Sequence, residues 1–345
     1  GITETNYTLK VLNSTIRSGL YACEESCSST YYNSDVRVRN STLYGGFYAY
    51  QSLNFTLHNS EVNGPLKITS VNTTMSDSKI NDMTYIDSRV IKITDMSRLH
   101  GLEDHPNVFN PSNHVTIHNV TLTAQVDLEQ SGGSLDFTNS TCSSWARISH
   151  DYVNMTNVSF ASYLNLLSAS NHAHLNNVTI GSELFGTVND LRLEDVDTGY
   201  GEYTLRANKF WMSNSTFKAS SNPSNYHIYV SDLDNANNAS SSDVYIYNST
   251  IIFDANRDES DEFVFDIYTT GDIWIIDSEI NSTGYYYSMI ELEGNNVEIT
   301  NSTLYSGTYN DESHPDPDYL YSYLNIYSDD LDITNSYLST YASFD

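Results

Sequence analysis

Apolar and polar residues alternate along most of this chain, in short segments that recur at a regular interval. With an Asn or Asp taken as the anchor of each segment, the positions two and four before it and three after it are apolar, and those between are mostly polar. Alternation with a period of two predicts strands with one buried face, whereas a helix would need a period of 3.6. No helical period is found in the sequence.

Fifteen segments share this pattern, and between Asn40 and Asn214 their spacing is mostly 18 to 20 residues. Only Thr73 breaks the column four before the anchor, and only Arg98 and Thr198 break the column three after it. The anchors are Asn13, Asn40, Asn59, Asp77, Asp95, Asn119, Asn139, Asn157, Asn177, Asp195, Asn214, Asn248, Asp277, Asn301 and Asn335.

A third apolar run completes many segments, as in "LKIT" (66–69) and "YLNLL" (163–167). Three short strands per repeat predict an all-β fold, a single parallel β-helix (β-solenoid) of about fifteen turns of roughly 18–20 residues. We expect one domain over residues 1–345, with regular turns in 36–217 and loop-inserted turns in 1–35 and 218–345. Neither end shows an amphipathic helix, so we expect no capping helices.

The anchor has a structural role in this fold, because Asn and Asp tolerate the left-handed backbone of a tight turn. Stacked anchors can also exchange side-chain hydrogen bonds. This pattern resembles the asparagine ladder of right-handed parallel β-helix proteins, the pectate-lyase-like superfamily. That resemblance implies a right-handed coil and raises the hypothesis of carbohydrate cleavage.

The motif Asn-Ser-Thr, as in "VEITNSTL" (297–304), is also the acceptor signal for N-linked glycan. Nine anchors fit that signal, but four anchors are Asp, which cannot carry the sugar. Exchange of Asn for Asp favours a ladder over glycosylation at the anchors. The signals outside the ladder are the better glycan candidates: Asn6, Asn54, Asn72, Asn154, Asn238 and Asn281.

The charge is strongly acidic, with 15 Lys and Arg against 44 Asp and Glu. This balance argues against nucleic acid as a partner. The distribution is uneven, because residues 1–100 hold nine basic and nine acidic residues, while nineteen acids and no base follow Arg257. No run of eighteen apolar residues is present, so we expect no membrane span.

Three cysteines suggest two different environments. Cys142 occupies an apolar column, which predicts a buried free thiol, whereas Cys23 and Cys27 in "YACEESC" lie in an insertion and could form a local disulfide. Such a disulfide would indicate an oxidising, extracellular setting.

The sequence holds few candidates for catalysis or metal binding. Asp266 and Glu291 lie on adjacent turns and are the catalytic pair if the protein is an enzyme. Their registers differ by one residue when counted to the following anchor, which predicts that they do not share a face. The acidic loop around Asp258, Glu259, Asp261 and Glu262 could hold Ca²⁺ or could simply be solvated, and we expect no other cofactor.

An outward aromatic cluster is the clearest candidate for an interaction surface. Trp211, Tyr245 and Trp274 stand three residues before successive anchors, and Tyr247 and Ile276 lie beside them. The cluster could stack sugar rings, meet another protein, or be covered by the insertion 218–243.

Three functions fit these observations. The favoured one is a non-enzymatic structural protein at the cell surface that assembles head to tail with itself into a filament, surface layer or sheath. The composition resembles that of archaeal surface-layer and sheath proteins. The alternatives are a secreted carbohydrate-active enzyme and an adhesin that binds surface glycans.

Overall fold

The computed structural model describes eleven stretches of the chain: residues 8–22, 35–104, 114–128, 133–199, 203–220, 225–231, 240, 242–254, 262–284, 287–308 and 321–342. These residues form strands joined by short turns and contain no helix. The described part therefore has no helix that is long and apolar enough to span a membrane. The prediction of an all-β parallel solenoid is confirmed.

The chain divides into two compact units, Gly1–Ser162 and Tyr163–Asp345. The prediction of a single domain stays a prediction. Unit 1 contains β1 (Thr8–Leu12), β2 (Thr15–Ile16), β3 (Leu20–Ala22), β4 (Asp35–Arg39), β5 (Thr42–Leu43), β6 (Phe47–His58), β7 (Glu61–Val62), β8 (Leu66–Ser76), β9 (Lys79–Asp104), β10 (His114–Leu122), β11 (Val126–Leu128), β12 (Ser134–Cys142), β13 (Ala146–Ile148) and β14 (Tyr152–Phe160).

Unit 2 is built in the same way and has longer connections. It contains β15 (Leu164–Ile180), β16 (Leu184–Thr198), β17 (Tyr203–Ser213), β18 (Thr216–Ser220), β19 (Asn225–Val230), β20 (Val244–Tyr247), β21 (Thr250–Asp254), β22 (Glu262–Tyr268), β23 (Ile273–Ile276), β24 (Glu279–Gly284), β25 (Tyr287–Thr300), β26 (Thr303–Thr308), β27 (Tyr321–Thr334) and β28 (Tyr337–Ala342).

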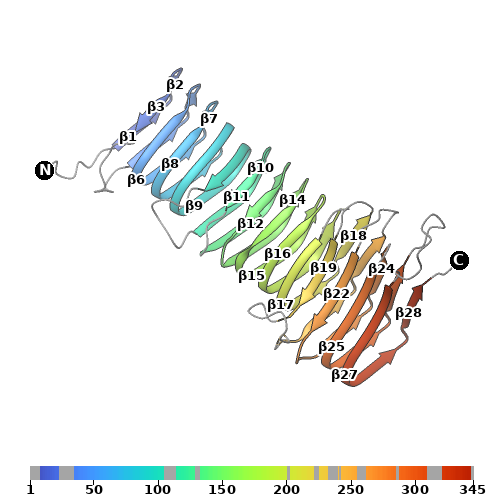
Figure 1. Cartoon of the computed structure of the whole chain (residues 1–345). Helices are drawn as coiled ribbons and strands as arrows, with labels where there is room; N and C mark the ends of the chain where they lie inside the picture. Colours follow the sequence, from blue (N-terminus) through green and yellow to red (C-terminus); the bar gives the residue numbers. More distant parts are fainter. Residues whose placement is uncertain are drawn as a thin grey trace. The chain divides into compact units, whose positions relative to one another are not determined.

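Strands of successive turns pair in parallel and in register, as Figure 1 shows for β10, β12 and β14 of unit 1. Inward residues therefore stack on equivalent inward residues. Ile117 lies on Phe137, and Phe137 lies on Met155. All three side chains are buried. The apolar columns of the sequence are the core of each unit.

The three breaks in these columns have local explanations. A register shift between β9 and β10 places Leu99, and not Arg98, opposite Leu122, and Leu99 is buried. Thr73 is buried with its hydroxyl 2.7 Å from those of Ser70 and Ser88. Thr198 is buried and its hydroxyl donates to the Thr216 carbonyl. Each hydroxyl thus has a partner, as a buried polar group requires.

All fifteen anchors adopt positive φ, from 44° to 56°, and no other described non-glycine residue does. Their side chains form ladders within each unit. The Asn40 amide donates to Asn13 Oδ1 over 3.0 Å, and the Asn59 amide donates to Asn40 Oδ1 over 2.9 Å. In unit 2 the Asn248 amide donates to Asn214 Oδ1 over 2.8 Å.

A second stack runs beside the ladder, formed by the Ser that follows many anchors. Ser78 Oγ donates to the Ser76 carbonyl over 2.6 Å and accepts from the Ser60 backbone N–H over 3.1 Å. The same pair of bonds recurs at Ser41, Ser60, Ser140, Ser215, Ser249, Ser278, Ser302 and Ser336. In the Asn-Ser pair of the motif, the Asn therefore adopts the left-handed backbone of the turn, and the Ser hydroxyl bonds to backbone groups of the turn.

Candidate functional site

The aromatic cluster lies on the outer face of unit 2, on strands β17, β20 and β23. The parallel register places Trp211 beside Tyr245, and Tyr245 beside Trp274. The rings of Tyr245 and Trp274 stack with centroids 4.5 Å apart and planes at 7°. Tyr245 is 41% exposed. The cluster named from the sequence is thus a column of side chains fixed by strand register.

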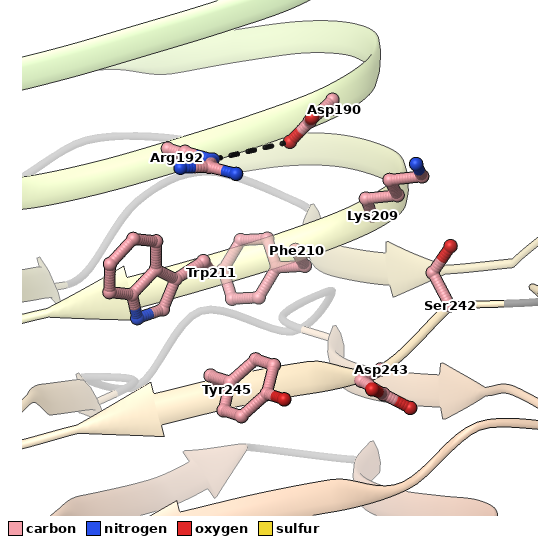
Figure 2. Close-up of a pocket in the computed structure, with 8 residues that line it drawn as sticks. All are labelled: Asp190, Arg192, Lys209, Phe210, Trp211, Ser242, Asp243 and Tyr245. Carbon is pink, nitrogen blue, oxygen red and sulfur yellow. Dashed lines mark ion pairs between the residues drawn. The ribbon is translucent and has the colours of Figure 1, made fainter.

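A hollow of about 630 Å³ opens at the Trp211 end of this column. Figure 2 shows the eight residues that line it, and we call it the aromatic hollow. They are Asp190, Arg192, Lys209, Phe210, Trp211, Ser242, Asp243 and Tyr245. They come from β16, from β17, from β20 and from the segment that leads into β20.

Charged groups surround the rings of the aromatic hollow. The Arg192 guanidinium lies 5.3 Å from the centroid of the Trp211 ring, and its Nε lies 3.7 Å from Asp190 Oδ1. Asp190 Oδ2 lies 3.3 Å from His172 Nδ1. Partial burial, and then the carboxylate of Asp243, raise the pKa of Tyr245. The site combines aromatic surface with hydrogen-bond donors and acceptors.

The prediction that Asp266 and Glu291 do not share a face is wrong. They are direct partners in the register of β22 with β25, between buried neighbours on both strands. The count to the next anchor failed because four residues join β22 to β23, Thr269 to Asp272, whereas three join the equivalent strands within β25. Burial, and then the charges of Glu291 and Glu293, raise the pKa of Asp266 to about 6.

A smaller hollow of about 380 Å³ lies next to this pair. It is lined by Tyr287, Met289, Glu291, Tyr323 and Asn325. Asp266 does not line it. The pair therefore faces outward beside the hollow, with only one of its two carboxylates in the wall.

Several residues named from the sequence lie outside the described part of the chain. These are Asn6, Cys23, Cys27, Asn238, Asp258, Glu259 and Asp261. Glu262 begins β22. Among the described residues, no group of three or more His, Cys, Asp or Glu is placed to hold a metal ion. The disulfide and the Ca²⁺ loop stay predictions.

The remaining glycan candidates occupy outward positions on the strands. The Asn72 amide donates to Asn54 Oδ1 over 3.0 Å, and the Asn54 amide donates to Asp35 Oδ1 over 2.8 Å. The Asn154 amide donates to Asp136 Oδ1 over 3.2 Å. Asn281 is half-buried. A glycan on Asn54 or Asn72 would replace one of the two hydrogens of an amide nitrogen that already donates in this stack.

Cys142 is free and buried, as the column predicts. Burial raises the pKa of its thiol to about 11. Cys142 is therefore a core residue with little thiolate at neutral pH.

The charged wall of the aromatic hollow was not predicted from the sequence. Arg192 is the register partner of Trp211, and Asp190 is the register partner of Lys209. Both pairs stand at equal distances from their anchors, so the alignment contained the signal. The approach of Ser242 and Asp243 was not predictable, because it depends on the path of a long connection.

Comparisons with protein-family models, with curated proteins and with solved structures found no match to this chain. The resemblance to pectate-lyase-like proteins and to surface-layer proteins therefore rests on the repeat and the composition alone.

Proposed function

We propose that this chain is a structural protein of a cell surface that associates end to end with copies of itself. The observation that carries the proposal is the exposure of core positions in the last described turn. Leu331 and Ile333 are 49% and 43% exposed, whereas their partners one turn earlier, Val297 and Ile299, are at most 1% exposed. Large apolar side chains exposed together favour a binding partner.

The backbone of the same turn supports association. Among the described strands, β27 and β28 each pair along one edge only, with β25 and β26. The first described strand, β1, likewise pairs only with β4. Unpaired strand edges are templates for the addition of another strand.

A second copy of this chain suits the exposed turn better than an unrelated strand. If β1 of one copy continues the register of β27 in another, Leu9 covers Leu331 and Val11 covers Ile333. Lys10 then stands beside Asp332, so opposite charges meet. A hydrogen bond from Asn13 of one copy to Asn335 of the other would extend the ladder.

The uneven charge favours the same orientation. The contact brings the N-terminal part, where nine bases balance nine acids, against the acidic C-terminal part. Repeated addition of this kind gives a filament, or a ring if the rotation closes. Such an assembly is suited to an extracellular layer or sheath.

Sedimentation velocity over a range of protein and salt concentrations tests the proposal. We expect species larger than the monomer that grow with protein concentration, and with salt, because salt screens repulsion between acidic copies. Leu331→Lys and Ile333→Lys should abolish them, while Tyr152→Lys, at an exposed position in unit 1, should not. A folded wild-type chain that stays monomeric under every condition would contradict the proposal.

Glycoside hydrolysis is the second candidate function, because Asp266 and Glu291 are register partners. Neighbouring parallel strands lie about 4.8 Å apart, close to the roughly 5 Å between the carboxyl groups of retaining glycosidases. Release of reducing ends from a polysaccharide panel, lost in both Asp266→Asn and Glu291→Gln, would favour this function over a purely structural one.

A further inference from the structure

The aromatic hollow has the size and the position of a ligand site. Its volume of about 630 Å³ falls in the range of about 300–1,000 Å³ that is typical of small-molecule sites. It lies on the outer face of unit 2, and it is separate from the exposed turn that the proposed assembly uses. An inference about this hollow therefore stands independently of the proposed function.

The rings at the hollow are held in place before any ligand arrives. Trp274 stacks on Tyr245, and the Arg192 guanidinium lies over Trp211. Trp211 and Tyr245 also lie on paired strands, β17 and β20, which fix the backbone beneath their rings. Rigid aromatic side chains lose little conformational entropy when they bind, so they are effective contact surfaces.

The polar groups of the hollow balance one another in charge. Asp190 and Asp243 are offset by Arg192 and Lys209, although the whole chain carries a formal charge of −29. The two acids disfavour an anionic ligand, and the two bases disfavour a cationic one. A neutral ligand with many hydroxyl groups can use both kinds of wall, because hydroxyls donate and accept hydrogen bonds.

A protein partner fits this wall less well than a sugar does. Four of the eight lining residues are charged. The buried centre of a protein–protein interface is depleted of charged residues. A sugar ring has an apolar face that can lie against an aromatic ring and an edge of hydroxyls that can reach the surrounding charges.

We propose that the aromatic hollow binds a neutral oligosaccharide. Its apolar ring faces lie against Trp211 and Tyr245. Its hydroxyls donate to the carboxylates of Asp190 and Asp243 and accept from Lys209 and from the Ser242 hydroxyl.

Titration calorimetry of the full chain with soluble hexasaccharides tests this proposal. The probes are the neutral cellohexaose, laminarihexaose and mannohexaose and the anionic galacturonate hexamer. We expect at least one neutral probe to bind, and to bind more tightly than the galacturonate probe. Trp211→Ala and Tyr245→Ala should each raise the Kd by about tenfold or more, a change of about 1.4 kcal/mol. Tyr44→Ala, at an exposed tyrosine in unit 1, is the matched control and should leave the Kd unchanged.

Three binding outcomes would overturn the proposal, and a fourth comes from sedimentation. The binding outcomes are the absence of binding by every neutral probe, tighter binding of the galacturonate probe, and an unchanged Kd in both hollow variants when circular dichroism shows that they are folded. Sedimentation of Trp211→Ala separates this site from the proposed assembly. If that variant loses self-association, the cluster is a contact between copies and not a sugar site.

Discussion

Ser78 follows the anchor Asp77 and holds the place of the Ser in the Asn-Ser-Thr motif, so it shows what that Ser does. Its hydroxyl donates to the carbonyl of Ser76 in its own turn and accepts from the N–H of Ser60 in the turn before. The side chain is buried, so water cannot replace these bonds. The Ser of the motif satisfies backbone groups of the turn, which is a reason for its repetition that does not involve glycan.

Ser78→Ala should therefore lower the free energy of unfolding by about 1–3 kcal/mol, the cost of leaving a buried polar group without a partner. Thr74→Ala, at an outward position of β8 four residues earlier, should change the free energy of unfolding by no more than about 0.5 kcal/mol. Urea denaturation of both variants gives the comparison. Equal effects would mean that the serine stack contributes nothing specific.

His150 is a buried residue whose charge is costly. It is fully buried in unit 1, and neither ring nitrogen has a hydrogen-bond partner in the described part of the chain. Burial lowers the pKa of His150 to about 4, from a usual value of 6.5. The unfolded chain thus binds a proton between pH 6.5 and 4 that the folded chain does not.

Above about pH 6.5 the neutral His150 does not lower the free energy of unfolding. As the pH falls from 6.5 toward 4, that free energy decreases by on the order of 3 kcal/mol, because only the unfolded chain binds the proton. Asp266 has the opposite sign, because its raised pKa makes stability fall as pH rises between 3.8 and about 6. Denaturation of wild type and His150→Leu across this range isolates the histidine. The stability of wild type relative to His150→Leu should fall as the pH falls from 6.5 toward 4.

At the scale of the strand, alternation predicted which residues face inward because a pleated strand has a period of two. Ile117, Phe137 and Met155 were placed correctly for this reason. Alternation does not determine the number of residues in a turn. The extra residue between β22 and β23 therefore spoiled the predicted register of Asp266 and Glu291, and the shift beside Leu99 was not foreseen.

The same limit explains how much of the candidate site was predictable. Trp211, Tyr245 and Trp274 were found because each lies a fixed distance before its anchor. The hollow beside them was not found, because a cavity depends on how side chains and connections from several turns fill space. Columns of one residue type are visible in a sequence, but the gaps between them are not.

At the scale of the whole molecule, the proposed end-to-end association depends on one relation between two described turns. Among the described residues, core positions are buried in the middle turns, Leu9 and Ile16 of the first turn are partly covered, and Leu331 and Ile333 in the turn of β27 and β28 are exposed. The register of β1 supplies the residues that would cover them. The charges of Lys10 and Asp332 then select one orientation of addition.

Site-specific cross-linking between copies measures this relation directly. Lys10→Cys and Asp332→Cys are placed in separate chains that also carry Cys23→Ser and Cys27→Ser, and the chains are mixed and oxidised. Neighbouring strands place Cα atoms about 4.8 Å apart, within the range of about 4.4–6.8 Å that a disulfide needs. Glu298→Cys, in the same column one turn earlier, replaces Asp332→Cys in the control.

End-to-end association in register predicts a disulfide-linked dimer that forms only in the mixture of the first two chains. Mass spectrometry of that dimer should identify a disulfide between the peptides that carry positions 10 and 332. No cross-link in that mixture, or one that forms equally well with the Glu298→Cys chain, would contradict end-to-end association in register.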